Sequence, residues 1–342
     1  MIVVYILIAI LSFGFLIFVH ELGHFMFAKK FGVAITEFSM GMGPKLFSKK
    51  GKDGVDYSIR LFPIGGYVAM EGEDEESDNP NAFNKKPAWQ RFIIVIAGAL
   101  MNIIVATIII TILISTHEAY GSTTVSKFAD GATSESNGLC IYDEIIKING
   151  SRVHTANELG YEIQRNGYKP VEITVLRNGE KVVLENVVFP QTVLEGVVFG
   201  VPDFSVLPEE KTFSSVVKNS FYTCKSTVKM IWESLFDLIS GRYGVEHMSG
   251  PIGVTGAITT AAKTSAYSLF YLIAVIAMNL GVFNLLPIPA LDGASLLLLL
   301  VEMITKKKLP EKIEGTIKAI GFALLMLLAI MVSFKDIVYL FK

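Results

Sequence analysis

Residues 2–27 read IVVYILIAILSFGFLIFVHELGHFMF, and this stretch decides the fold. A helix rises about 1.5 Å per residue, so about 20 apolar residues cross a hydrocarbon core of about 30 Å. No basic residue precedes the run and it contains no small-residue cleavage site, so we interpret it as a retained span rather than a signal peptide. Three more apolar runs of similar length occupy residues 92–115, 268–291 and 317–340. The sequence therefore predicts an α-helical membrane protein with four transmembrane helices.

The composition agrees with this interpretation. Of the 342 residues, 51% are hydrophobic and only 18% are charged, against about 25% charged residues in a typical soluble domain. The formal net charge of −2 offers no field that would attract nucleic acid. Two cysteines, Cys140 and Cys224, cannot build a disulfide framework, and we expect both to be small buried residues. The composition excludes an ordinary soluble enzyme and a nucleic-acid-binding protein.

The distribution of lysine and arginine indicates the orientation of the spans. These residues are concentrated between the first two runs, at residues 28–91, and between the last two, at residues 306–318. Short loops rich in lysine and arginine stay in the cytosol. We therefore expect these two loops to be cytosolic, and both termini and the domain-sized segment 116–267 to be extracytoplasmic.

The first run contains His20-Glu21-Leu22-Gly23-His24, an HExxH motif. On a helix, His20 and His24 project from one face and can offer two imidazole nitrogens to one Zn²⁺, with Glu21 beside the metal as a general base. Ionisable side chains inside an apolar span are costly unless they are paired or bind a ligand. The motif therefore predicts a catalytic zinc site. The remaining histidines are interpreted as polar surface residues: His117, His154 and His247.

A catalytic zinc site needs a third protein ligand. One candidate is Asp292, which directly follows the third apolar run. The other is an acidic cluster, read most simply as a solvated linker, formed by Glu71, Glu73, Asp74, Glu75, Glu76 and Asp78. Both His20 and Asp292 fall near the expected cytosolic ends of their spans, which favours Asp292.

Several motifs of the chain resemble those of the site-2 protease family of intramembrane zinc metalloproteases (peptidase family M50), in its bacterial form with one extracytoplasmic PDZ domain. The HExxH motif and residues 284–293, which are similar to the family pattern N-x-x-P-x-P-x-L-D-G, carry the resemblance. Shorter similar motifs are FSMGMGP at 38–44, PIGGYV at 63–68, KPAWQR at 86–91 and GPIG at 250–253. The chain departs from the family where Ala99 follows Gly98, a position often held by proline, and where Ala294-Ser295 follow Gly293.

This resemblance implies that His20, His24 and Asp292 bind Zn²⁺ and that Glu21 is the catalytic general base. It also implies a set of substrate-binding residues: Asn284, Pro287, Gly65 and Gly66. For Asn284 a second interpretation stays open, because an amide within a span can simply bond one helix to another.

The order of the elements predicts the domain organisation. Residues 1–116 hold two spans and, at about 36–70, a membrane-associated cytosolic β-hairpin, whose strand edge can unwind a helical substrate by β-addition. Residues 117–205 are expected to form a PDZ-like α+β domain, which either captures peptides or filters substrates by size. Residues 206–265 are expected to be an amphipathic helical linker, lying on the membrane surface or packed under the PDZ-like domain. Residues 266–342 hold the last two spans.

Together these inferences predict a zinc-dependent endopeptidase of regulated intramembrane proteolysis in a bacterial plasma membrane. Its substrates are expected to be single-span membrane proteins, for example anti-sigma factors or signal-peptide remnants, trimmed first by an upstream site-1 protease. Two alternatives stay open. One is a membrane-anchored zincin that cleaves at the cytosolic surface with a ligand from the acidic cluster, and the other is a non-enzymatic membrane scaffold with a PDZ-like domain.

Overall fold

The computed structural model describes residues 2–73, 76–194, 196–242, 244, 248–308 and 311–340. Asp74, Glu75 and His247, which were singled out from the sequence, lie outside the described residues. The chain divides into two compact units, one of Met1–Ile109 with Met248–Lys342 and one of Ile110–His247. Both units combine helices with β-strands.

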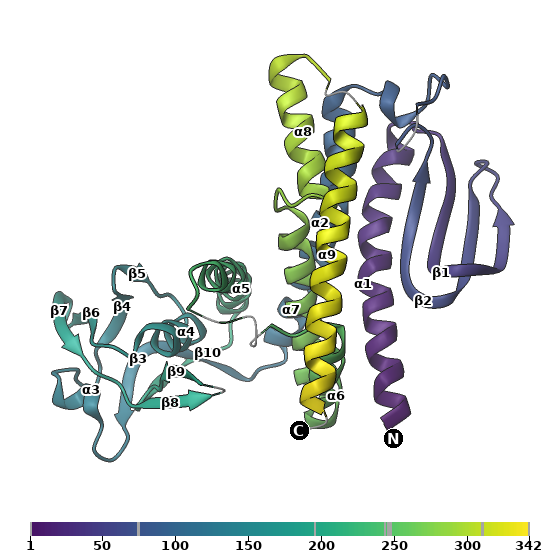
Figure 1. Cartoon of the computed structure of the whole chain (residues 1–342). Coiled ribbons are helices and arrows are strands. Elements are labelled where there is room, and N and C mark those ends of the chain that lie inside the picture. The colour runs from purple at the N-terminus through teal and green to yellow at the C-terminus, as the bar shows by residue number, and fades with distance from the viewer. Residues whose placement is uncertain are drawn as a thin grey trace. The chain divides into compact units, whose positions relative to one another are not determined.

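The first unit is built mainly from long apolar helices (Figure 1). These are α1 (Ile2–Lys30), α2 (Ala88–Ser115), α6 (Pro251–Thr264), α7 (Ala266–Asn284), α8 (Asp292–Thr305) and α9 (Glu311–Leu340), with a short 3-10 helix η1 (Phe83–Lys85). Within the described residues, α1, α2, α7 and α9 are long and apolar enough to cross a membrane. Each predicted span therefore corresponds to one helix.

The third span differs from its predicted bounds, because α7 ends at Asn284 whereas the apolar run continues to residue 291. The two prolines within residues 285–291 lack the backbone N–H that a continuing helix needs. The chain turns there and starts a new helix, α8, with Asp292 as its first residue. Gly293 permits the turn, since a Cβ at this position would lie 2.0 Å from the carbonyl oxygen of Leu286.

A two-stranded antiparallel sheet packs against α1 and is formed by β1 (Ile35–Lys50) and β2 (Asp56–Met70). Both strands bend, so residues 35–40 pair with residues 66–70 on one side, and residues 37–40 pair with residues 56–59 on the other. Among the described residues, 66–70 pair on that one side only, which leaves a strand edge beside α1. Large apolar side chains of the sheet are exposed: Met40, Met42, Leu46, Phe47, Ile59, Leu61 and Phe62.

A polar network around Glu37 joins the two strands of this sheet. Ser58 Oγ and Arg60 Nη2 donate hydrogen bonds to Glu37 Oε1, at 2.5 and 2.9 Å. Burial by itself raises the pKa of Glu37, but these hydrogen bonds outweigh burial and lower the pKa to about 2. Glu37 is therefore charged at neutral pH and holds both partners on β2.

The second unit is an antiparallel sheet with helices around it. Its strands are β3 (Ala119–Phe128), β4 (Glu144–Ile148), β5 (Ser151–Arg152), β6 (Val171–Arg177), β7 (Glu180–Val187), β8 (Gln191–Leu194), β9 (Val197–Gly200) and β10 (Phe204–Glu210). The main sheet has the order β10-β3-β4-β6-β7, with β5 beside β4, while β8 and β9 pair separately. A short α3 (Thr133–Ser136) and the longer α4 (Ala156–Asn166) complete it. Strands β6 and β7 form an antiparallel hairpin, and α4 begins after Thr155, whose side chain accepts a hydrogen bond from the backbone N–H of Glu158.

The last helix of this unit, α5 (Phe213–Ile239), turns its polar side inward. Its buried side chains are mostly polar and include Asn219, Thr223 and Asp237. Ion pairs join α5 to α4, among them Arg165 Nη1 to Asp237 Oδ2 at 2.5 Å. The opposite side exposes an apolar stripe: Phe213, Val217, Phe221, Trp232, Phe236 and Ile239. The apolar side of α5 is therefore the exposed one.

A buried carboxylate holds the loop before β4. Asp143 is 1% exposed, accepts two hydrogen bonds from Arg177 on β6, each 2.7 Å long, and a third from the backbone N–H of Cys140 at 2.8 Å. The expectation that both cysteines are buried is wrong, since Cys140 is exposed and Cys224 is half-buried, and neither forms a disulfide.

Replacing Arg177 by leucine should destabilise the second unit by about 3 kcal/mol, because it leaves the buried Asp143 carboxylate without its cationic partner. Hydrogen exchange of the full-length protein would show this as faster exchange of β4 and β6 amides. Arg152→Leu is the matched control, because Arg152 is exposed and no ion pair of its guanidinium is found in the described residues. Equal protection in both variants would contradict the role of the pair.

Candidate metal centre

Three side chains from two helices converge in the first unit. His20 and His24 lie on adjacent turns of α1, and their Nε2 atoms are 3.1 Å apart. Oδ2 of Asp292, at the start of α8, lies 3.1 Å from Nε2 of His20 and 3.4 Å from Nε2 of His24. Both histidines are buried and Asp292 is half-buried. Among the described residues, this is the one group of histidine, cysteine and acidic side chains with the spacing of a metal site.

The triangle of donor atoms fits zinc. With zinc-to-ligand distances of about 2.0–2.1 Å, two ligands of a tetrahedral ion lie about 3.3 Å apart, close to the three measured separations. Asp292 Oδ2 is also buried without a hydrogen-bond donor, which a carboxylate oxygen tolerates poorly unless a cation takes its lone pair. Two imidazoles and one carboxylate leave a fourth position open, as in catalytic zinc sites.

Each histidine has a neighbour at its second ring nitrogen. Nδ1 of His24 lies 2.9 Å from the backbone carbonyl oxygen of Ile94 on α2, so it donates a hydrogen bond and leaves the Nε2 lone pair facing the other ligands. Nδ1 of His20 has two amides nearby, with Nδ2 of Asn102 and Nδ2 of Asn284 each at 3.5 Å. The rings are thereby oriented from outside the triangle.

Two glycines allow α1 and α2 to approach at this level. A Cβ at Gly23 would lie 2.4 Å from the carbonyl oxygen of Ala97, and a Cβ at Gly98 would lie 2.3 Å from Nε2 of His24. Neither position has room for a side chain. Gly98 directly precedes Ala99, the position where the chain departs from the family motif.

Glu21 lies next to His20 on α1 and faces the sheet. The backbone N–H of Val68 on β2 donates a hydrogen bond to Glu21 Oε2 at 3.2 Å. Gly66 is close as well, since a Cβ built there would lie 3.6 Å from Cγ of Glu21 and 2.8 Å from the carbonyl oxygen of Ser39. The strand edge formed by residues 66–70 therefore runs beside the proposed base.

The other predicted substrate-binding residues lie around this centre. Asn284 ends α7 and is half-buried beside His20, while Pro287 is exposed in the turn that leads to Asp292. Gly65 has a φ of +90° and lies against Met42, so it marks a bend of β2. The structure thus brings Gly66 close to Glu21 and Asn284 close to His20, while Gly65 lies against Met42 and Pro287 is exposed.

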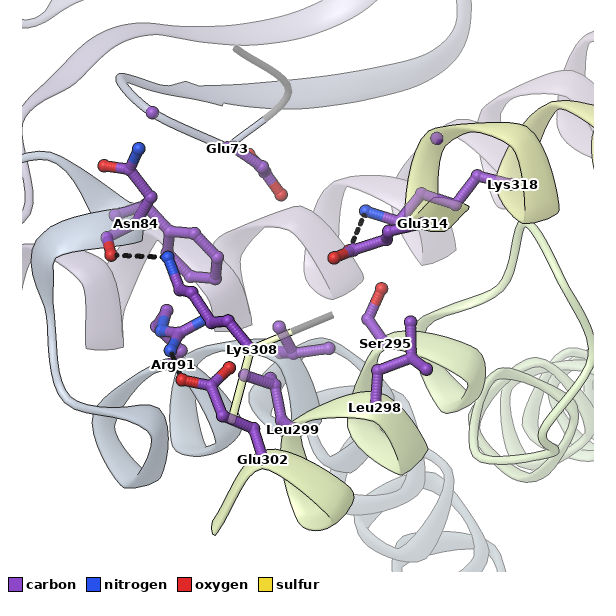
Figure 2. A pocket seen from close by; sticks show the side chains of 14 residues that line it. Glu73, Asn84, Arg91, Ser295, Leu298, Leu299, Glu302, Lys308, Glu314 and Lys318 are labelled. Atoms are coloured by element: carbon purple, nitrogen blue, oxygen red, sulfur yellow. Dashed lines mark hydrogen bonds and ion pairs between the residues drawn. The ribbon is translucent and has the colours of Figure 1, made fainter. Parts of the chain in front are cut away.

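Two residues of the acidic cluster, Glu71 and Glu73, have surroundings other than the histidine pair. Glu71 accepts hydrogen bonds from Ser77 Oγ and Asn79 Nδ2, at 2.6 and 2.7 Å. Glu73 lines a pocket of about 140 Å³ further along α8, which contains none of the three candidate ligands. Figure 2 shows the ion pair of Arg91 with Glu302 and that of Lys318 with Glu314 in its wall. The geometry favours Asp292 over this cluster as the third ligand.

Four residues near the metal centre were missed from the sequence: Val68, Ile94, Gly98 and Asn102. Val68 and Ile94 act through backbone groups, which every residue type carries, so no sequence pattern predicts them. Asn102 did leave a signal, since it is the one amide side chain in the run 92–115, and a polar side chain within a span is a functional candidate.

Comparison with known proteins places the chain in a family. The family model for peptidase family M50 matches residues 8–328. A protein of Clostridium acetobutylicum, named provisionally as a zinc metalloprotease, is 39% identical over 98% of this chain and 97% of its own length. The regulator of sigma-W protease RasP of Bacillus subtilis is 29% identical over 97% of this chain and 98% of its own length. The zinc metalloprotease RasP of Shouchella clausii is 30% identical over 96% of this chain and 98% of its own length.

These matches cover nearly the whole chain, and the donor set described above fits the metal that the relatives' names state. Four helices suited to crossing a bilayer agree with a multi-pass membrane protein. The chain belongs to peptidase family M50, the site-2 protease family, and is a zinc metalloendopeptidase.

Proposed function

We propose that this protein is an intramembrane endopeptidase that cleaves single-span membrane proteins within or near the bilayer. The observation that carries the proposal is the convergence of the His20, His24 and Asp292 donor atoms within 3.4 Å, with both histidines on a helix suited to span a membrane. Such side chains are costly in an apolar span unless they bind a cation. A catalytic zinc site within the membrane-spanning helices would explain why these side chains are present there.

In this mechanism His20, His24 and Asp292 hold the zinc and Glu21 is the general base. Bound there, zinc acidifies a water molecule and polarises the scissile carbonyl. Glu21 takes the proton of the attacking water and returns it to the nitrogen of the departing amine. The hydrogen bond from Val68 N–H fixes one Glu21 oxygen, so the other is left for proton transfer. Asn284, with Pro287 beside it, is proposed to orient the substrate backbone.

The strand edge at residues 66–70 suits a substrate that must be unwound. A helical peptide hides its amides in intrahelical bonds, whereas a strand paired to an exposed edge presents them in extended form. This edge passes Glu21 at Val68, so a peptide paired there would run beside the proposed base. Gly65 and Gly66, at the start of this edge, are proposed to contact the substrate backbone. The exposed apolar side chains of β1 and β2 support contact of this hairpin with the membrane.

We propose the following organisation for the remaining parts. Both termini and the second unit are extracytoplasmic, in a bacterial plasma membrane, and the loops rich in lysine are cytosolic. The second unit is a PDZ-like domain over about residues 117–205, which screens substrates already trimmed by a site-1 protease. The linker over 206–265 contains α5, whose exposed apolar stripe suits the membrane surface. The name of the Bacillus subtilis relative suggests substrates that regulate sigma factors.

Replacing Glu21 by glutamine should abolish cleavage while zinc stays bound, because glutamine keeps the size of the side chain but cannot accept the proton. The loss should be at least about 10²-fold in rate, as for removal of a general base. The test is cleavage of single-span peptides in proteoliposomes, together with zinc content by elemental analysis. Cleavage by both forms would contradict the assignment, and a chelator should stop the wild-type enzyme.

Replacing Asp292 by alanine should release zinc, because two imidazoles alone bind the ion weakly and the third donor is lost. We expect zinc content of the purified protein to fall by about 10-fold or more. Glu71→Ala is the matched control from the acidic cluster and should retain the metal. Retained zinc and activity in Asp292→Ala would favour instead the surface zincin with a ligand from that cluster.

The exposed thiol of Cys140 offers a test of orientation. In intact bacterial cells, a membrane-impermeant maleimide should label Cys140, because the second unit is proposed to face outward. The Cys140→Ser variant, which keeps Cys224, gives the background. Labelling that requires permeabilised cells would reverse the proposed orientation.

A further inference from the structure

We propose that Asn102 is a positioning residue that holds His20 in its metal-binding orientation by accepting a hydrogen bond from Nδ1–H. The inference rests on the proposed zinc ligands and assigns a role to a side chain outside them. Asn102 lies on α2, is 1% exposed, and has Nδ2 at 3.5 Å from Nδ1 of His20.

His20 has two ring nitrogens, and their surroundings decide which one carries the proton. Its Nε2 faces both Nε2 of His24 and Oδ2 of Asp292 at 3.1 Å, so this nitrogen carries the lone pair for the cation. A neutral imidazole has a single N–H. The proton therefore resides on Nδ1, which points out of the triangle and requires an acceptor. In His24 the corresponding acceptor is the backbone carbonyl oxygen of Ile94, which lies 2.9 Å from Nδ1.

The acceptor for this proton is the side-chain oxygen of Asn102. The Asn102 side chain is enclosed, and its Oδ1 is buried without a hydrogen-bond partner. The two ends of a carboxamide have almost the same shape, and a half-turn about the Cβ–Cγ bond exchanges them. In the exchanged orientation the oxygen meets Nδ1–H of His20. One rotation thus gives both the imidazole donor and the amide oxygen a partner.

Asn102 and Asn284 differ in their burial. Nδ2 of Asn284 lies at the same 3.5 Å from Nδ1 of His20, but one N–H needs only one good acceptor. Asn102 sits inside α2 and is enclosed, whereas Asn284 ends α7 beside the turn and is half-buried. The enclosed amide of Asn102 is therefore not accessible to a substrate peptide, whereas the half-buried amide of Asn284 is. Assigning His20 to Asn102 leaves Asn284 available to the substrate.

The placement of Asn102 on α2 supports the same role. It lies one turn after Gly98, at the spacing that puts both on one face of the helix. The absence of a Cβ at Gly98 makes room for both imidazole rings. A Cβ built there would lie 2.3 Å from Nε2 of His24 and 2.9 Å from Cε1 of His20. One face of α2 therefore gives the histidine pair both its space and its orientation.

The experiment measures zinc affinity of the purified full-length protein in detergent, by competition with a chromophoric chelator. Loss of a hydrogen-bond partner behind a ligating histidine typically weakens metal binding by about 10- to 100-fold, and we expect this for Asn102→Leu. Asn102→Asp should bind within about 3-fold of wild type, because a carboxylate accepts the same Nδ1–H bond. Asn284→Leu is the matched control and should also retain zinc affinity while cleavage falls.

Substitution with Co²⁺ gives a second readout that a purely structural role would not move. The visible absorption of the Asn102→Leu protein should change in shape, because the His20 ring is free to turn, and that of Asn102→Asp should not. Thermal unfolding of all three variants checks the fold, and Asn102→Ala replaces the leucine variant if that one fails to fold.

Two results would overturn the inference: wild-type zinc affinity in Asn102→Leu or its alanine replacement, or an equal loss in Asn284→Leu. Absence of zinc binding by the wild-type protein would instead contradict the proposed function itself. The two failures are therefore distinguishable in one titration series.

Discussion

The close approach of α1 and α2 is the constraint on which the metal centre depends. A side chain at Gly23 would meet the backbone of Ala97, and one at Gly98 would meet the imidazole of His24. With both positions occupied by hydrogen atoms only, α2 comes near enough for the Ile94 carbonyl to hold His24. The helices of a bilayer gain little from the hydrophobic effect when they associate, so small residues that permit backbone contact decide where they meet.

Burying polar groups in an apolar span is costly, and the structure compensates each of them locally. His24 is held by a backbone carbonyl, Glu21 by a backbone amide of β2, and Asp292 by its position at the first turn of α8, where the helix dipole favours a negative charge. Three separate elements thus converge on one turn of α1. The small sheet beside α1 thus contributes to the surroundings of the HExxH motif, because its Val68 amide donates a hydrogen bond to Glu21.

The sequence was sufficient for the parts of the fold that follow from chemistry along the chain. The apolar runs predicted the spanning helices, and the HExxH spacing predicted two histidines on one helix face. Long-range geometry was harder. The third run looked continuous to residue 291, but its prolines and the close contact of Gly293 with Leu286 end α7 at Asn284. Contacts made by backbone groups, such as those of Ile94 and Val68, depend on tertiary packing and have no signature in residue type.

The helix α5 shows a further limit of pattern reasoning. The sequence predicted an amphipathic helical linker at 206–265, within which α5 spans Phe213–Ile239, but periodicity alone does not say which side of a helix is buried. The usual expectation is that the apolar side packs inward. Here the ion pairs with α4, such as that of Arg165 with Asp237, hold the polar side inward and leave Phe213 86% exposed. Predicted membrane spans precede and follow α5 in the sequence, so lipid as well as water is available to solvate this helix. An outward apolar stripe is stable where it contacts lipid.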